Sequence, residues 1–159
     1  MKAKILSNVK LEATLKNLRR KKKKIGFTNG TFDILHLGHI RYLQKAKSTA
    51  DILIVGVNTD RSVKSYKAPN RPINGQAERL EVLAALECVD YVILFDDPTP
   101  LNLICKIRPH VLIKGADWKK EDIVGAKEVE SWGGKVRRIT FVAGKSTTGT
   151  IEKILQTVK

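Results

Sequence analysis

The chain has 159 residues, which is enough for one domain with a substantial hydrophobic core. No apolar stretch approaches the roughly 20 residues of a membrane-spanning helix, and the first residues lack the apolar core and cleavage site of a secretory signal. We therefore expect a cytoplasmic protein that has no membrane partner.

The formal net charge of +14 first suggests a nucleic-acid partner, because polycations displace counterions from phosphate backbones. Residues 1–24, however, contain ten Lys and Arg residues against one acidic residue, whereas residues 25–159 contain twenty against fifteen. A basic run of this kind is usually a solvated surface stretch. We therefore divide the chain into a basic N-terminal extension (1–24) and a domain (25–159), which we expect to bind small phosphorylated molecules and no nucleic acid.

Within the extension, Val9, Leu11, Leu15 and Leu18 lie partly at helical spacing, which indicates a short helix whose apolar positions are a candidate interface. After it, apolar segments alternate with helical patterns. The predicted strands are 24–29, 51–58, 90–95, 110–115 and 135–142, and the predicted helices are 39–47, 76–87, 100–106, about 125–132, and 147–158. This alternation predicts an α/β fold, namely a Rossmann-like parallel sheet of about five strands with helices on both faces.

Parallel sheets of this kind bind ligands beyond the carboxyl ends of their strands. The polar segments that follow the predicted strands are 28–30, 58–60, 95–97, 114–117 and 144–148. We therefore expect these five segments to meet at one site.

Two of the three histidines, His36 and His39, flank Leu37 and Gly38 between the first predicted strand and the next helix. Glycine lets backbone amides approach an anion closely, and the start of a helix favours phosphate. Imidazoles there can donate further hydrogen bonds to phosphate oxygens. The segment has neither the glycine spacing of the dinucleotide fingerprint nor the H-E-x-x-H arrangement of zinc sites. The pattern therefore favours phosphate handling, and we expect no protein metal ligands.

The segment "GTFDILHLGH" resembles the phosphate-binding signature of the nucleotidyltransferase superfamily, which includes cytidylyltransferases, pantetheine-phosphate adenylyltransferase and class I aminoacyl-tRNA synthetases. Within it, the chain is similar to the bacterial heptose 1-phosphate adenylyltransferases in "VGVNTDRSVK", "RPINGQAERLEVLAALECVDYVILF", "HVLIKGADW", "EVESWGGKV" and "STTGTI". The resemblance covers about 25–155 and departs at Thr31, where many relatives carry cysteine. In many bacteria this domain is fused behind a sugar kinase domain. This sequence contains no such kinase domain, so the resemblance implies a stand-alone form.

The resemblance implies transfer of the adenylyl group of ATP to D-glycero-D-manno-heptose 1-phosphate, with release of pyrophosphate, for lipopolysaccharide or related surface-glycan precursors. It implies Mg2+ bridging the phosphates, no covalent enzyme intermediate, and a homo-oligomer, either a dimer or a tetramer. It assigns catalysis to His36, His39 and Lys67. It assigns nucleotide or substrate binding to Thr28, Asn29, Gly30, Phe32, Asp33, Gly38, Asn58, Asp60, Arg79, Lys114, Gly115, Asp117, Ser146, Thr147 and Thr148.

Several of these residues also have a plain structural interpretation. Lys67 could be a solvated loop lysine, and Arg79 could form an ion pair with Glu78 or Glu81. Asp33 and Asp60 could cap local backbone, and the "STT" segment could be only a helix cap. Trp118 could serve packing rather than base stacking. Four alternative functions also stay open. They are a glycerol-3-phosphate cytidylyltransferase, an FAD synthetase-like enzyme, a nucleic-acid or membrane-surface binder acting through the basic terminus, and an inactive scaffold.

Overall fold

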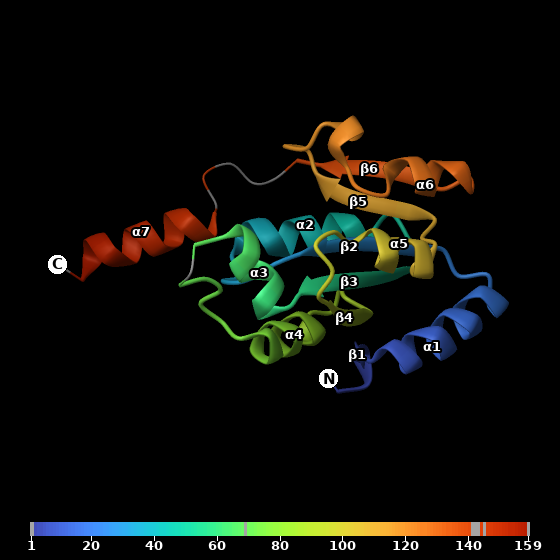
Figure 1. Cartoon of the computed structure of the whole chain (residues 1–159), viewed down its shortest axis with the longest axis horizontal. Helices are drawn as coiled ribbons and strands as arrows, with labels where there is room; N and C mark the ends of the chain where they lie inside the picture. The colour runs from blue at the N-terminus through green and yellow to red at the C-terminus, as the bar shows by residue number, and fades with distance from the viewer. Residues whose placement is uncertain (1, 69, 141–143, 145, 159) are drawn as a thin grey trace.

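The structure is a computed structural model, and it describes residues 2–68, 70–140, 144 and 146–158. Six parallel strands form one sheet in the order β1-β4-β3-β2-β5-β6, and Figure 1 shows them stacked from β6 to β1. The strands are β1 (Ile5–Leu6), β2 (Ile25–Gly30), β3 (Ile52–Asn58), β4 (Tyr91–Phe95), β5 (Val111–Gly115) and β6 (Lys135–Ile139). The α-helices are α1 (Asn8–Arg20), α2 (Leu37–Lys47), α3 (Asp60–Tyr66), α4 (Gln76–Ala85), α5 (Leu101–Ile107), α6 (Ala126–Ser131) and α7 (Thr147–Thr157). The prediction of a Rossmann-like α/β fold is confirmed.

Helices cover both faces of the sheet and give it two hydrophobic layers. Phe27 and Ile54 point from the strands into a layer that contains the buried side chains of α1, α5 and α6. Leu53 and Val55, on the opposite face, pack with side chains of α2 and α4. Because successive strand residues point to opposite faces, a strand buried on both sides has a continuous apolar sequence, as the central strands do.

The boundaries differ from the predicted ones at a few places. Strand β1 was not predicted, because two residues are too few to show a strand pattern. The predicted strand 135–142 ends at Ile139, and residues 141–143 lie outside the described part of the chain. Helix α2 begins at Leu37 rather than at His39, with His36 as its N-cap residue.

The first 24 residues are built into the sheet and its core. Strand β1 pairs with β4, and Ser7 caps α1 by accepting a hydrogen bond from the Lys10 amide. Leu11, Leu15 and Leu18 are 0%, 2% and 5% exposed and belong to the same hydrophobic layer as the sheet. These three leucines are therefore not available as the candidate interface, whereas Val9, the fourth position, is 80% exposed. The boundary at residue 24 between an N-terminal extension and a separate domain stays a prediction.

This packing predicts that Leu15→Ala destabilises the protein by about 2–5 kcal/mol, since the truncation leaves a cavity in the core. Urea denaturation followed by circular dichroism measures the change. The matched control is Leu155→Ala on α7, where the leucine is 62% exposed and the expected change is within about 0.5 kcal/mol. Equal effects of the two substitutions would contradict the packing of α1.

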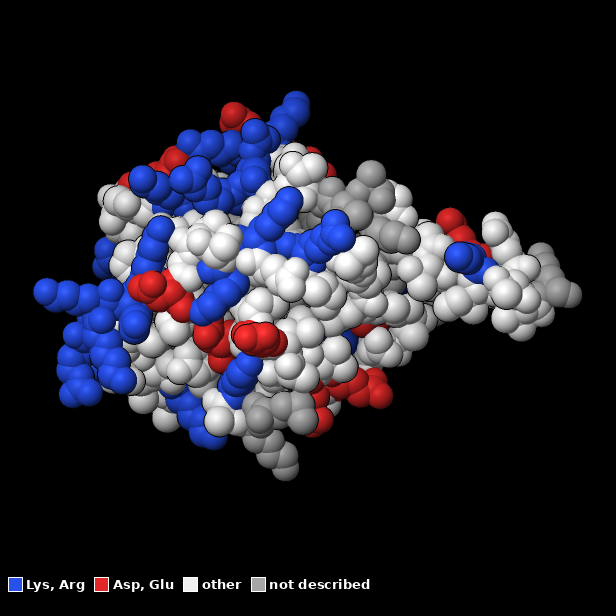
Figure 2. Space-filling view, turned by 180° about the vertical axis from the view of Figure 1, so that it is seen from behind, with Lys and Arg blue, Asp and Glu red and all other residues white. Residues whose placement is uncertain are grey.

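The basic run follows α1 directly. Helix α1 ends at Arg20, and the exposed Lys21, Lys22, Lys23 and Lys24 lead straight into β2 at the amino end of the sheet. Figure 2 shows that Lys and Arg gather at the end of the molecule away from the projecting α7. The positive charge of these four lysines therefore lies beside a packed helix. It lies at the amino ends of the strands, whereas ligands are expected at the carboxyl ends.

Helix α7 projects from the body of the molecule (Figure 1). None of its residues is buried, and Ile154 and Leu155 are 52% and 62% exposed. Among the described residues, no helix combines the length and the apolar character that crossing a membrane requires.

Candidate functional site

A cavity of about 560 Å³ opens at the carboxyl ends of the parallel strands. Strand β2 lies between β3 and β5 in the sheet, so the chain winds to one side after β2 and reaches the other side at β5. Such a switch point is where an open parallel sheet leaves a crevice. Ten of the expected site residues line the cavity: Asn29, Gly30, Phe32, Asp33, His39, Asn58, Lys67, Lys114, Gly115 and Thr147.

The turn between β2 and α2 presents His39 to the cavity. Phe32 has a φ of 47°, which is unusual for a bulky residue, and its ring lies 5.5 Å from that of His39. Gly30 is needed beside it, because a Cβ atom there would lie 3.1 Å from the Phe32 ring. Gly38 is buried in the first turn of α2. The turn is thus held by close contacts that a longer side chain at Gly30 would disturb.

The two histidines of the turn stack on each other, with ring centroids 4.0 Å apart. His39 is half-buried, and burial lowers its pKa to about 4, with smaller contributions from His36 and Lys67. At neutral pH His39 is therefore an uncharged hydrogen-bonding group. His36 stacks on it but is not among the described residues that line the cavity.

Lys67 follows the last turn of α3 and lines the cavity. Its pKa is lowered mainly by burial and then by the positive charge of Arg71, while Asp33 acts in the opposite direction. Lys67 is exposed, as the solvated-loop interpretation expects, and it also lines the cavity. Lys67 brings a positive charge to the same cavity as His39.

Lys114 stands at the end of β5 and donates a hydrogen bond to Asn29 Oδ1 on β2, at 2.5 Å. Burial lowers its pKa to about 8, and the nearby Asp117 carboxylate opposes this shift. Asp117 itself is exposed and is not among the described lining residues. A lysine with this pKa is only partly charged at pH 8 and gains charge when an anion approaches.

This pKa predicts that nucleotide binding at pH 8 takes up protons, because a bound phosphate stabilises the charged form of Lys114 and raises its pKa. Calorimetry of ATP binding in two buffers with different ionisation enthalpies measures the uptake. The Lys114→Met variant is expected to lack most of it. An uptake that is the same in the variant and in the unchanged protein would remove Lys114 as its source.

The Asp33 carboxylate is nearly fully buried, although Asp33 is among the lining residues. It accepts hydrogen bonds from the amides of Ile73 and Asn74 and pairs with Arg71 at 2.8 Å. Asp33 therefore holds the distant loop before α4, and it does not cap the local backbone as the structural interpretation assumed.

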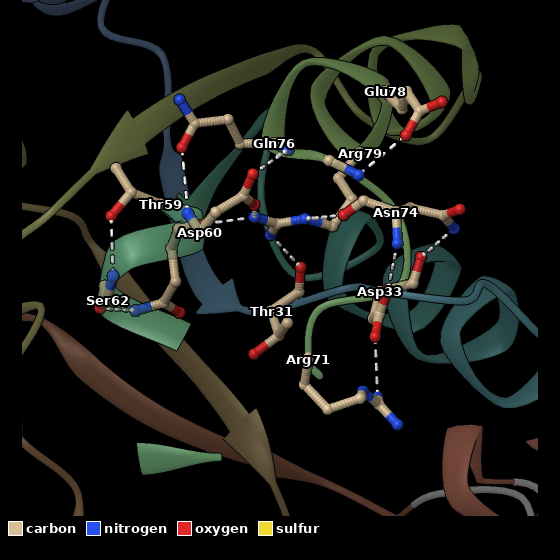
Figure 3. Close-up of polar contacts among 12 residues, drawn as sticks. Thr31, Asp33, Thr59, Asp60, Ser62, Arg71, Asn74, Gln76, Glu78 and Arg79 are labelled. Carbon is tan, nitrogen blue, oxygen red and sulfur yellow. Dashed lines mark hydrogen bonds and ion pairs between the residues drawn. The ribbon is translucent and has the colours of Figure 1, made fainter. Parts of the chain in front are cut away.

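Arg79 and Asp60 point toward each other from α4 and α3 (Figure 3). Arg79 is 1% exposed and pairs with Asp60 at 2.6 Å, so its partner comes from α3 and not from its own helix. Neither residue is among the described lining residues. The N-cap of α3 is Thr59, so Asp60 does not cap that helix through its side chain.

The remaining expected residues divide between the cavity and its supports. Thr28 is fully buried and shares a hydrogen bond with the Tyr42 hydroxyl at 2.8 Å. Thr147 lines the cavity, and its hydroxyl donates to the Ile34 carbonyl at 3.3 Å. Ser146 caps α7 by accepting from the Gly149 amide, while Thr148 is exposed. Of the predicted segment 144–148, residue 145 lies outside the described residues.

Residues 27–152 of the chain match the family model described as cytidylyltransferase-like. The chain belongs to this family. It is therefore a nucleotidyltransferase, as the pattern around the two histidines predicted.

Curated relatives extend this similarity. The chain is 52% identical over 152 residues to the bifunctional protein HldE of Geotalea uraniireducens (strain Rf4), which covers 96% of this chain and 31% of that protein. It is 55% identical over 134 residues to the bifunctional protein HldE of Geobacter metallireducens (strain ATCC 53774 / DSM 7210 / GS-15), covering 84% and 27%. The chain thus spans about a third of the length of these relatives. A match over 96% of the chain is also longer than the range 25–155 and takes in part of the first 24 residues.

Solved structures show the same architecture. The lipopolysaccharide core biosynthesis protein from Thermoplasma volcanium GSS1 is 27% identical, with a TM-score of 0.61, over 76% of this chain and 97% of that one. The pantoate-beta-alanine ligase from Francisella tularensis has a TM-score of 0.60 at 19% identity, over 96% of this chain and 78% of that one, and shares the fold alone.

The wall of the cavity has a polar part and an apolar part. Lys67 and His39 bring hydrogen-bond donors to the wall. Sequence reasoning missed the apolar part, which comprises Tyr66, Pro98, Pro100, Trp118, Ile123 and Val124. Trp118 is 50% exposed and lines the cavity, so packing alone does not describe it. Its position just after the 114–117 segment was the available signal.

Proposed function

We propose that the protein transfers the adenylyl group of ATP to D-glycero-D-manno-heptose 1-phosphate, giving ADP-heptose and pyrophosphate. The observation that carries this proposal is the convergence of His39, Lys67, Lys114 and Thr147 on one cavity, within a nucleotidyltransferase fold. The cavity of about 560 Å³ is within the range of small-molecule sites. The choice of a heptose is supported by the segments "LIKGADW", "WGGKV" and "STTGTI", and a role in lipopolysaccharide precursor synthesis by the name of the Thermoplasma neighbour.

The chemistry needs positioning and charge stabilisation rather than a covalent intermediate. An oxygen of the sugar 1-phosphate forms a bond to the α-phosphorus of ATP, and the bond from that phosphorus to the bridging oxygen of pyrophosphate breaks. Lys67 supplies positive charge, and neutral His39 donates a hydrogen bond to the phosphate oxygens on which charge develops. Magnesium would be held mainly by the phosphates of ATP and would supply positive charge there.

The test is a panel of pyrophosphate-release assays that crosses four nucleoside triphosphates with heptose 1-phosphate, glycerol 3-phosphate and FMN. We expect release from ATP with heptose 1-phosphate. Release only from CTP with glycerol 3-phosphate, or only from ATP with FMN, would assign the protein to the corresponding alternative. The absence of release from every pair would favour an inactive scaffold. A preparation of the His39→Ala variant, purified in the same way, controls for contaminating enzymes.

A further inference from the structure

A buried guanidinium connects three segments that form the cavity wall. Arg79 donates hydrogen bonds to the backbone carbonyls of Thr31, Asn58 and Asn74 at 2.6, 2.8 and 3.0 Å. Its fourth partner is Asp60, whose carboxylate also accepts from the amide of Gln76 at the start of α4. Figure 3 shows Arg79 at the centre of this network. We propose that Arg79, held by Asp60, is a positioning residue that places His39 and Lys67 for the transfer. This inference rests on the proposed function.

The path from Arg79 to His39 is short. Thr31, whose carbonyl accepts from Arg79, immediately precedes Phe32. Phe32 has the positive φ of 47° and lies against the His39 ring. A bulky residue keeps such a backbone conformation only when its surroundings hold it there. The hydrogen bond from Arg79 is one of the contacts that hold this turn.

Arg79 is connected to Lys67 through residues on both sides of Lys67 in the sequence. Lys67 lies between Asp60 and Asn74 in the sequence, and Arg79 contacts both. Helix α3 begins at Asp60 and leads to Lys67, and the loop after Lys67 returns to Asn74 beside Asp33. Arg79 therefore fixes the two ends of the segment that carries the cavity lysine.

Charge gives a second connection. The positive charges of Arg71 and Arg79 both lower the pKa of Lys67, and the Asp33 carboxylate raises it. His39 and Lys67 also influence one another, since Lys67 contributes to the lowered pKa of His39. Loss of the Arg79 charge alone would raise the pKa of Lys67, so this pKa measures the charge coupling, whereas the loss of kcat and its partial recovery in Arg79→Lys report on positioning.

The experiment compares Arg79→Lys and Arg79→Met with the unchanged protein and with Arg61→Met. Arg61 is an exposed control on α3 that pairs with Asp96 and does not line the cavity. Pyrophosphate release gives kcat and KM across pH. Thermal unfolding identifies an assay temperature at which every variant is folded. NMR of labelled lysine side chains gives the pKa of Lys67. We expect Arg79→Met to lower kcat at least ten-fold, to change the KM for ATP less than three-fold, and to raise the pKa of Lys67. Arg79→Lys should recover part of kcat, and Arg61→Met should match the unchanged protein.

If Arg79→Met is folded and keeps both kcat and the pKa of Lys67, the inference is wrong. If Arg79→Met does not fold, Asp60→Asn is tested in its place. Asp60→Asn removes the ion pair and leaves the three contacts of Arg79 with backbone carbonyls. An unchanged kcat in Asp60→Asn would then overturn the role of the ion pair. The NMR titration does not depend on the substrate. A raised Lys67 pKa in a protein that turns over no substrate of the panel would therefore reject the proposed function, and the positioning role with it, while keeping the charge coupling between Arg79 and Lys67.

Discussion

Replacing His39 by alanine is expected to lower kcat for pyrophosphate release by about 10²–10³-fold, which is the usual effect of removing one donor to a developing phosphate or oxyanion charge. His39 lines the cavity and is half-buried, and its pKa of about 4 keeps it neutral at pH 7. We therefore expect it to act as a hydrogen-bond donor, while lysine supplies the positive charge. Steady-state kinetics with ATP and heptose 1-phosphate measure the loss.

The control for this variant is the third histidine. His110 accepts a hydrogen bond from the Ile25 amide through Nδ1 at 3.0 Å, at the opposite ends of the strands from the cavity. His110→Gln is expected to keep turnover. A loss of activity in His110→Gln equal to that in His39→Ala would indicate a general effect on folding and would contradict a specific role for His39.

The lowered pKa of His39 also sets the pH dependence of stability. The unfolded chain takes up a proton on this residue below its ordinary pKa of 6.5, whereas the folded chain does so only near 4. The unfolded state therefore binds more protons in this window, and stability is lost as the pH falls from 6.5 to 4. The His39→Ala variant should lose less stability than the unchanged protein over the same window, which provides a check on the folded state that is independent of turnover.

The features that could be predicted from the sequence were those with a local pattern. The alternation of apolar strands and helices gave the sheet, and the strand-to-helix turn around His36 and His39 located the site, because ligands bind at the carboxyl ends of parallel strands. His39, Lys67, Lys114 and Thr147 do line one cavity. Their roles in catalysis and binding stay predictions.

The features that could not be predicted depend on contacts between distant residues. Asp33 holds amides 40 and 41 positions away, and Arg79 reaches the Thr31 carbonyl over 48 positions. No local spacing shows such partners, so sequence reasoning assigned both Arg79 and Asp33 to nucleotide or substrate binding, with an ion pair on its own helix and a local backbone cap as their structural interpretations. Strand β1 and the burial of α1 were obscured in another way, because the short strand has no period and the neighbouring lysines suggested a solvated extension.

The position of the charge bears on the competing idea of a polyanion binder. The basic run lies at the amino end of the sheet, whereas the cavity lies at the carboxyl ends of the strands. Because α1 contributes Leu11, Leu15 and Leu18 to the core, removing residues 1–24 would take away core packing together with charge. Turnover measured after such a deletion would therefore report on folding first.

Replacing Lys67 by methionine is expected to lower kcat by about 10²-fold or more, because methionine keeps the unbranched length and removes the charge that the proposed function assigns to the transferred phosphate. The matched control is Lys64→Met, one turn earlier on α3, where the lysine is exposed and is not among the described lining residues. Lys64→Met should behave as the unchanged protein, and steady-state kinetics of the three proteins give the comparison.

The pH profile then identifies the source of the charge. Burial and Arg71 lower the pKa of Lys67 below its ordinary value of 10.5, so turnover that needs its charge declines as the pH rises through that lowered pKa. Lys67→Arg keeps a charge that does not titrate in this range, although its planar guanidinium presents different geometry and recovers only part of kcat. We expect the decline at high pH to move upward or disappear in Lys67→Arg. A decline that stays unchanged in that variant and moves in Lys114→Arg would assign it to Lys114, whose pKa is about 8, and would contradict the catalytic role of Lys67.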